Sequence, residues 1–374
     1  MIEVKEVKKA REIRDFINFP LGLYKGNPYF VPPLYGDEKK MFRRNFVYSD
    51  TCDSVFFNAY REGRMCGRIQ GIIQRASNEK NNEKRVRFTR FDAIDDDEVA
   101  EALFGAVEKW ALSKGMDTVV GPLGYSDLER EGLLVDGFDR ISTFEEQYNA
   151  EYYGALIEGR GYAKEVDWVE SIVKIPEGGM DPKVFKLEEL LLKRHKLHYG
   201  TARNVNEFLD KYADGFFELL DKSYDKIYGT VPFTDAMKKM MIDNFKLIID
   251  LRYVAVVLTE DEKVVALGIC FPSIGEAIQK SGGRLTPGAI TRILKAVKKP
   301  RVIDFGLVGV DPDYINHGIG GMMVGGIARM LKENNIDHAE TNLNLETNEA
   351  IRALWKYFDS EEHKRRRCYV KKLV

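Results

Sequence analysis

The chain has 374 residues, more than one compact hydrophobic core usually holds, so its length favours two domains. Its 57 basic and 59 acidic residues give a net charge of −2, a balance that gives no support to nucleic acid as a partner. No apolar run in the sequence approaches the ~20 residues needed to span a bilayer, and the amino terminus lacks the apolar core of a signal peptide. We therefore expect a cytoplasmic protein without a membrane partner. The cysteines lack metal-ligand spacing, which predicts no metal site: Cys52, Cys66, Cys270 and Cys368.

The first half of the chain predicts a mixed α/β domain. Runs of β-branched and aromatic residues alternate with a stretch that repeats apolar residues at helical spacing. The expected strands are residues 2–7, 55–60, 65–74, 86–93 and 118–121, and the expected helices are residues 8–19 and 99–111. A strand, a helix and another strand thus follow one another over residues 86–121.

Residues 176–182 carry the densest run of turn-forming residues near the middle of the chain, which places a domain boundary there, between 1–176 and 177–374. Beyond it the order of elements recurs. Helices are expected at 183–194, 205–222 and 235–245, strands at 253–258, 264–272, 301–310 and 336–345, and a further helix ends near residue 335. The recurrence indicates two α/β domains of similar plan, each with a mixed sheet.

A glycine-rich segment, residues 310–321, joins the strand at 301–310 to the following helix. Gly318, Gly320 and Gly321 occupy the turn. A tight turn between a strand and a helix directs backbone N–H groups and the positive helix end toward a phosphate, and glycines let a pyrophosphate approach closely. By itself the pattern leaves a merely tight turn as the alternative. Within the helix, the pair Gly325-Gly326 predicts that something packs closely there, either the sheet or a coenzyme.

The segment Asn348 to Lys356 follows the next strand and makes the pattern more specific. Together with Gly318 and Gly320 it resembles the signature of the GNAT superfamily of N-acyltransferases, which carries R/Q-x-x-G-x-G/A at its central helix and N-x-x-A-x-x-L-Y-E on its last helix. Residues 121–139 in turn resemble a motif of a little-characterised bacterial group of tandem GNAT-like proteins. The resemblance implies two GNAT-like acyl-CoA N-acyltransferase domains in tandem.

The same resemblance implies a coenzyme site in the second domain, for acetyl-CoA or another acyl-CoA. Main-chain groups of Val308 and Val310 would pair with the pantetheine arm, and Asn348 would face the coenzyme from the other side. The pyrophosphate would be held by Ile315, Asn316, His317, Gly318, Ile319, Gly320 and Gly321. The family's basic or amide residue is replaced by Ile315, which leaves backbone amides as the main phosphate donors.

Three residues are candidates for the catalytic proton transfers. An alkylamine has a pKa near ~10.4, so a base must remove its proton before it attacks a thioester. Glu340 and Glu346 are the candidate bases, since they would share a face of a regular strand at 336–345; the alternative is a surface or supporting role for each. In the GNAT family a tyrosine often protonates the departing thiolate, and Trp355 occupies its position here. Tyr357 is the remaining candidate for this proton donor, although helical spacing places it about 200° around the helix from Trp355.

The first domain resembles a degenerate version of the second that lacks the phosphate-binding loop. Where its central helix begins, residues 92–98 contain no glycine and several carboxylates, which suit a helix amino end but repel a pyrophosphate. We predict that this domain does not bind coenzyme A. Its loop at residues 121–139 lines a substrate cleft in one interpretation and is an ordered surface loop in the other.

The function expected from the sequence is transfer of an acyl group from coenzyme A to an unidentified small amine or aminoacyl substrate. The alternative is a non-catalytic protein that binds or senses acyl-CoA, which the replacements at Ile315 and Trp355 favour. The basic run at residues 363–367 is expected to form a solvated turn before a closing strand.

Overall fold

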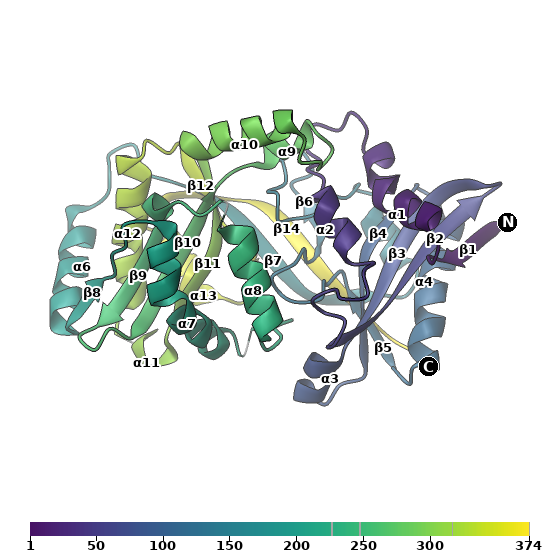
Figure 1. Ribbon diagram of the computed structural model, residues 1–374, viewed down its shortest axis with the longest axis horizontal. Coiled ribbons are helices and arrows are strands. Elements are labelled where there is room, and N and C mark those ends of the chain that lie inside the picture. Colours follow the sequence, from purple (N-terminus) through teal and green to yellow (C-terminus); the bar gives the residue numbers. More distant parts are fainter. Residues whose placement is uncertain (226, 247, 316, 374) are drawn as a thin grey trace. The chain divides into compact units, whose positions relative to one another are not determined.

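The computed structural model describes residues 1–225, 227–246, 248–315 and 317–373 (Figure 1). The chain forms two compact units. The first contains Met1–Trp168, Ile274–Ile293 and Lys364–Val374, and the second contains Val169–Ser273 and Leu294–His363. The units therefore differ from the contiguous halves 1–176 and 177–374, because two long strands and one helical segment are shared out between them.

In the first unit, the strands form a mixed sheet in which β4 and β5 are parallel and the other described strand pairs are antiparallel. The sheet order is β1 (Ile2–Glu6), β2 (Cys52–Arg61), β3 (Arg64–Gln74), β4 (Arg85–Ala93), β5 (Thr118–Gly121) and residues 364–372 of β14 (Asp359–Lys372), with β6 (Leu133–Asp136) paired to β14. The helices of this unit are α1 (Ala10–Leu23), α2 (Tyr35–Lys40), α3 (Arg75–Asn81), α4 (Asp97–Ser113), α5 (Tyr153–Glu158), α9 (Gly275–Gln279) and the first part of α10 (Pro287–Lys298).

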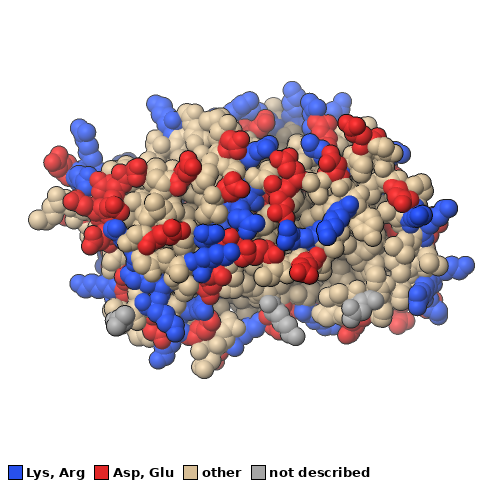
Figure 2. Space-filling model, turned by 180° about the vertical axis from the view of Figure 1, so that it is seen from behind, with Lys and Arg blue, Asp and Glu red and all other residues tan. Residues whose placement is uncertain are grey.

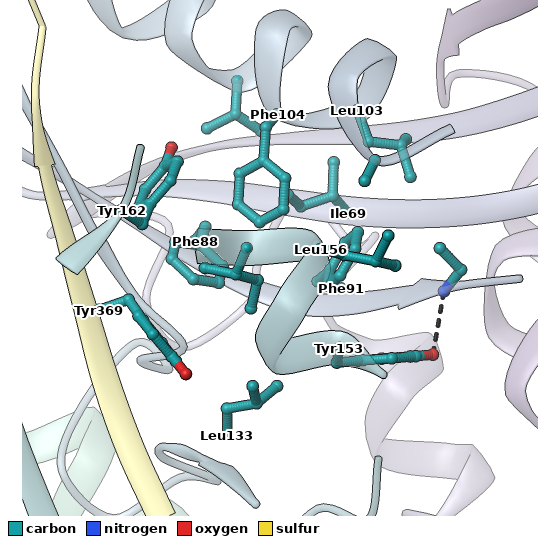
Figure 3. Packing of buried hydrophobic residues seen from close by; sticks show 14 of the residues in the cluster. Ile69, Phe88, Phe91, Leu103, Phe104, Leu133, Tyr153, Leu156, Tyr162 and Tyr369 are labelled. Atoms are coloured by element: carbon teal, nitrogen blue, oxygen red, sulfur yellow. Dashed lines mark hydrogen bonds between the residues drawn. The ribbon is translucent and has the colours of Figure 1, made fainter. Parts of the chain in front are cut away.

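The core of the first unit lies between α4 and the sheet (Figure 3). Helix α4 buries Val99, Leu103 and Val107 at helical spacing. It also buries Phe104, whose ring packs edge-on against Phe88 of β4 with their centroids 5.1 Å apart. At the end of β4, the Ala93 N–H donates to the Tyr153 hydroxyl at 3.0 Å, which ties α5 to the sheet. The apolar periodicity of residues 99–111 is thus the face that builds this core.

The second unit repeats the arrangement around one parallel pair, β11 and β12. Its sheet order is residues 169–174 of β7 (Ala163–Lys174), then β12 (His338–Glu340), β11 (Val302–Val310), β10 (Val264–Pro272), β9 (Val254–Thr259) and β8 (Leu197–Tyr199), with β13 (Asn344–Leu345) paired to β7. The helices are α6 (Pro182–Arg194), α7 (Val205–Tyr224), α8 (Asp235–Phe245), the 3₁₀ turn Leu251–Tyr253, α11 (Pro312–Ile315), α12 (Ile319–Glu333) and α13 (Glu349–Trp355).

Helices cover both faces of this second sheet. Val324 and Leu331 of α12 belong to one apolar cluster with Ile303 of β11. On the other face α7 crosses β10 and β11, and a Cβ added at Gly309 would lie 3.3 Å from the Ser223 Oγ (Figure 1). The sheet is therefore the middle of three layers in this unit.

The first of the two glycines in the middle of α12, Gly325, is explained by α6, which packs along it. A Cβ at Gly325 would lie 2.3 Å from the Glu188 Oε2, so only glycine allows this approach. The buried Glu188 carboxylate pairs with Arg329 of α12 and accepts a hydrogen bond from the Tyr199 hydroxyl. The close partner predicted for this glycine pair is a neighbouring helix, where the sequence suggested the sheet or a coenzyme.

The basic run at residues 363–367 lies within strand β14, so the prediction of a solvated turn was wrong. Lys364 and Arg366 are buried, Arg366 completely. The Lys364 Nζ donates to the Ile141 carbonyl at 3.2 Å, and Arg366 lies 3.8 Å from the Glu146 carboxylate. Internal acceptors of this kind let charged side chains occupy a strand that composition alone assigns to the surface.

Candidate functional site

In the second unit, strands β11 and β12 separate from one another part-way along their length. Their parallel register ends at the pair Asp304 and Glu340. Beyond it, β11 continues to Val310 paired with β10, and a bulge leaves Gly306 without a register partner between Phe305 and Leu307. A Cβ at Gly306 would lie 2.2 Å from the Phe271 ring, so the bulge requires glycine. The split leaves one edge of β11 to be satisfied by groups other than a strand.

Two side chains hydrogen-bond to carbonyls of this edge. The Asn342 Nδ2 donates to the Gly306 oxygen at 2.9 Å, and the Tyr224 hydroxyl donates to the Val308 oxygen at 3.0 Å. Val308, which the sequence assigns to the pantetheine arm, therefore has a carbonyl already bound by a side chain of α7. A ligand amide that used the same oxygen would compete with Tyr224.

The glycine-rich segment ends β11 and begins α12. Gly318 has φ +80°, a left-handed conformation that favours glycine, and as the N-cap it supplies no side-chain acceptor to the first turn. Gly320 and Gly321 face neighbouring helices, since added Cβ atoms would lie 3.1 Å from Leu354 and 3.2 Å from Leu187. The two later glycines thus also serve helix packing, and the positive end of α12 remains without a carboxylate cap.

The other predicted phosphate-binding residues differ in exposure. Ile315 and His317 are exposed, Ile319 is completely buried, and Asn316 lies outside the described residues. The His317 ring stacks on His195 with centroids 4.8 Å apart, and burial followed by the charge of His317 lowers the pKa of His195. Two imidazoles therefore stand beside the amino end of α12.

The segment after β13 has structural roles. The Asn348 Oδ1 accepts from the Ile351 N–H at 3.2 Å and caps α13. Trp355 is a core residue that packs on Phe305 and donates through its indole N–H to Asn344 at 3.1 Å. Tyr357 is 52% exposed, and among the described residues its hydroxyl forms no hydrogen bond. The core position of Trp355 explains why an indole is tolerated here.

Buried carboxylates lie where β11 and β12 separate. Ile303 and Ala339 belong to the cluster under α12, so the next residues, Asp304 and Glu340, point to the opposite face, which α7 covers. Both are buried, at 3% and 7% exposure. Burial and the charge of Asp304 raise the pKa of the neighbouring Cys270 thiol.

Glu340 is flanked by two histidines. Its Oε2 lies 3.3 Å from the Nε2 of the buried His363, on β14, and its Oε1 lies 3.8 Å from the Nε2 of His338. Among the described residues, neither ring nitrogen of His363 has a partner in hydrogen-bonding geometry. Sequence reasoning missed Asp304 and His363. The alternation of residue faces along the strand at 301–310 could have found Asp304, whereas His363 becomes a neighbour of Glu340 only through folding.

Glu346 does not share the environment of Glu340. The expected regular strand at 336–345 is interrupted after Glu340 and resumes as the two-residue β13, so the prediction that both carboxylates share one strand face was wrong. The Asn342 side chain, bound to Gly306, lies in this interruption. Glu346 follows β13 in a half-buried turn, where its carbonyl lies 3.5 Å from Arg352 Nη1.

No family model matches the sequence. Two curated bacterial proteins are similar to it: Protein YghO of Escherichia coli strain K12, 27% identical over 99% of this chain and 95% of that protein, and a protein named bacterial ceramide synthase of Caulobacter vibrioides, 28% identical over 80% of this chain and 79% of that one. Among solved structures, a tandem GNAT protein from the clavulanic acid biosynthesis pathway covers 100% of this chain and 98% of its own, with a TM-score of 0.56 and 11% identity.

The chain has the tandem GNAT fold. A GCN5-related N-acetyltransferase from Sphaerobacter thermophilus, with a TM-score of 0.50 and 11% identity, also matches 99% of this chain and 95% of its own. The fold class expected from the sequence, a mixed α/β sheet built as two GNAT-like domains, is confirmed.

The surface carries both signs of charge. Lys and Arg side chains are interspersed with Asp and Glu side chains over the face seen in Figure 2, in keeping with the net charge of −2. Within the described part of the chain, no helix combines the length and the apolar character that crossing a bilayer requires.

Proposed function

We propose that the chain is an acyl-CoA-dependent N-acyltransferase whose second unit binds acetyl-CoA or another acyl-CoA and passes the acyl group to an amine. The observation that carries the proposal is the split between β11 and β12, with an α12 amino end that has no side-chain cap at one side and buried carboxylates at the other. A strand edge can pair with the amides of pantetheine, and a helix amino end attracts a pyrophosphate.

In the proposed complex the coenzyme lies in the split with its pyrophosphate at the α12 end and its thioester at the carboxylate end. Its pyrophosphate lies at residues 315–321, where backbone amides and the positive end of α12 attract it. Its pantetheine arm runs along Val310 and Val308 toward the bulge at Gly306, displacing the Tyr224 hydroxyl from the Val308 carbonyl. The thioester then lies near Asp304 and Glu340, and Asn348 caps the neighbouring helix.

Glu340 is the proton acceptor in this proposal. The amine must lose a proton before it attacks the thioester carbonyl, because a protonated nitrogen has no free electron pair. His363, 3.3 Å from Glu340, can stabilise the carboxylate or take the proton onward. Glu346 and Tyr357, the other two candidates for proton transfer, are not assigned to this step.

The amine that accepts the acyl group is not identified, and a long-chain amino alcohol is the class most worth testing. One sequence relative is named bacterial ceramide synthase, and a ceramide is the N-acyl derivative of a long-chain amino alcohol. The test panel therefore includes a long-chain amino alcohol, a short alkylamine and amino acid amides.

Calorimetric titration with acetyl-CoA and a long-chain acyl-CoA, followed by a thiol-release assay across this amine panel, tests the proposal. Saturable binding with amine-dependent thiol release supports it. Absence of binding to both thioesters would sink the acyltransferase and the coenzyme site together. Binding without thiol release for any amine would favour instead a non-catalytic acyl-CoA sensor, the function suggested by Ile315 and Trp355.

A further inference from the structure

The first unit contains a cavity of its own, lined by charged side chains. Its volume is about 40 Å³, and it is partly open to solvent. Guanidinium and carboxylate groups are equally numerous in its wall: Arg68, Arg90 and Arg130, with Glu38, Asp92 and Glu129. Buried charge of this density is expensive unless each group has a partner.

Four of these groups form two ion pairs. The Arg68 Nη2 lies 2.8 Å from the Asp92 Oδ2, and the Arg90 Nη2 lies 3.1 Å from the Glu38 Oε1. These pairs cross the wall from β3 to β4 and from β4 to α2, so they hold the cavity in shape. A longer contact of 3.8 Å links Arg68 to Glu38, so the four charges balance one another as a network, and Arg130 and Glu129 are the wall groups with the weakest pairing.

Arg130 is the cation of the wall that has no ion pair within 4 Å, although the charges of Glu38 and Glu146 act on it from farther away. Its Nη2 donates to the Phe144 carbonyl at 2.7 Å, and this is its one hydrogen bond to the described residues, although a guanidinium has five N–H donors. Within the described chain no carboxylate lies within 4 Å of its nitrogens. Burial lowers the pKa of Arg130 to about 10, the direction expected of a guanidinium that lacks an anion.

Glu129 is the matching, weakly compensated anion. Its Oε2 accepts from the Tyr125 N–H at 3.2 Å, and the Arg90 Nη2 lies 3.9 Å away. Burial raises the pKa of this carboxyl. A carboxylate offers about four acceptor positions, so most of its capacity is unused.

The loop that carries both residues is firmly held. Tyr125 and Ser126 are buried, and the Tyr125 ring stacks on Tyr48 with centroids 5.0 Å apart. The Gln70 Nε2 donates to the Tyr125 hydroxyl at 2.7 Å. A Cβ at Gly124 would lie 2.5 Å from the Glu129 Cβ, so glycine is needed for the loop to fold back on itself. Glu129 and Arg130 are therefore presented to the cavity by ordered structure rather than by a mobile segment.

We infer that this cavity binds a small zwitterion such as a free α-amino acid, with its carboxylate on Arg130 and its ammonium group on Glu129. A guanidinium binds a carboxylate through two parallel hydrogen bonds, and each ligand charge meets a weakly paired wall group of opposite sign. A phosphate dianion is disfavoured, because Glu129 lines the same cavity as Arg130 and would repel the second negative charge. The inference concerns the first unit and stands apart from the proposed acyl transfer.

Calorimetry and thermal shift on the full chain, without any thioester, test the inference with four probes: L-alanine, acetate, methylamine and inorganic phosphate. L-alanine is expected to bind at least about tenfold more tightly than acetate or methylamine, since each of these offers one of the two contacts. Arg130→Gln should abolish binding of L-alanine and acetate. Arg64→Gln, at an exposed arginine of β3, is the matched control and should leave binding unchanged.

Glu129→Gln keeps the test decisive if Arg130→Gln fails to fold. This variant should bind L-alanine and acetate with equal affinity, because the contact to the ammonium group is lost while Arg130 stays. The inference is overturned if the wild-type protein binds none of the four probes, if phosphate binds most tightly, or if Glu129→Gln keeps the preference for L-alanine.

Discussion

The two units solve the same structural problem, the start of a helix after a strand, in opposite ways. In the first unit Asp96 caps α4: its Oδ1 accepts from the Val99 N–H at 3.2 Å, and its carboxylate lies 2.7 Å from Arg61. In the second unit Gly318 is the N-cap of α12 and offers no side chain. A capped helix end has satisfied donors and a neutralised dipole, whereas an uncapped one is left for an external anion.

A second difference lies where the parallel strands end. The last register pair of β4 and β5 is Arg87 with Val120, whereas the last pair of β11 and β12 is Asp304 with Glu340. One unit therefore places a cation and an apolar residue at this position, and the other places two carboxylates. Both differences agree with the proposed function, in which the second unit binds the phosphates of the coenzyme and removes a proton, and the first unit does neither.

The largest expected effect comes from closing the uncapped helix. Gly320→Glu adds a carboxylate in the first turn of α12, on the side that faces Leu354, and should weaken acetyl-CoA binding more than about 100-fold, because the negative charge neutralises the helix amino end that attracts the pyrophosphate. Gly105→Glu, on the exposed face of α4, is the control, since an added Cβ meets nothing there within 4 Å. Calorimetric affinity that is equal in the two variants would show that the coenzyme site lies elsewhere, provided that circular dichroism shows both to be folded.

Removing the proton acceptor Glu340 is expected to lower the rate of acyl transfer almost as much as Gly320→Glu lowers the affinity for acetyl-CoA. Glu340→Gln should lower kcat about 100-fold and leave the affinity for acetyl-CoA unchanged, because a buried amide preserves the packing but takes no proton. Glu346→Gln is the matched control, and its kcat should stay within about twofold of wild type. The reverse ranking of the two variants in a thiol-release assay would transfer the role of base to Glu346.

A smaller effect concerns the first unit, where the pH dependence of stability depends on the carboxyl group of Glu145. Burial raises the pKa of Glu145 to about 7, so the unfolded chain gives up this proton more readily than the folded chain. The contribution of the protonated Glu145 carboxyl to the free energy of unfolding is fully present below pH 4.5 and is lost as the pH rises to 7. Because Glu145 is only half-buried, solvent screens part of this effect, and Glu145→Gln should raise the free energy of unfolding by about 2 kcal/mol at pH 8 and by almost nothing at pH 4.5.

Urea unfolding at the two pH values measures this difference. Glu151→Gln, at an exposed position in the same unit, should show equal stability relative to wild type at both. A pH-independent effect of Glu145→Gln would mean that this carboxyl is ionised in the folded protein.

The smallest expected effect is a gain of affinity. Tyr224→Phe removes the hydroxyl that bonds to the Val308 carbonyl, so pantetheine no longer has to displace it. With about 1 kcal/mol for such a hydrogen bond, acetyl-CoA should bind about fivefold more tightly. Tyr357→Phe, which removes an exposed hydroxyl outside the split, should leave the calorimetric affinity as it is. A loss of affinity in Tyr224→Phe would show that this hydroxyl itself contacts the coenzyme.

Most of the secondary structure could be predicted from local pattern. The expected strand at 118–121 and the helices at 183–194 and 235–245 match β5, α6 and α8 to within one residue, because apolar periodicity and capping residues are local signals. The strand at 336–345 was predicted too long, since its interruption depends on Asn342 bonding to the bulge at Gly306 of another strand.

In the candidate site, too, some features follow from local sequence and others from tertiary contacts. The sequence by itself determined the tandem α/β plan and the glycine-rich strand-to-helix turn, both of which rest on residues close together in the chain. Only the tertiary structure decided that His363 lies beside Glu340, that Arg366 is buried, and that Arg130 lines a cavity. The reason is physical: the environment of a charged side chain is set by neighbours that folding brings together, and no local pattern of residues encodes them.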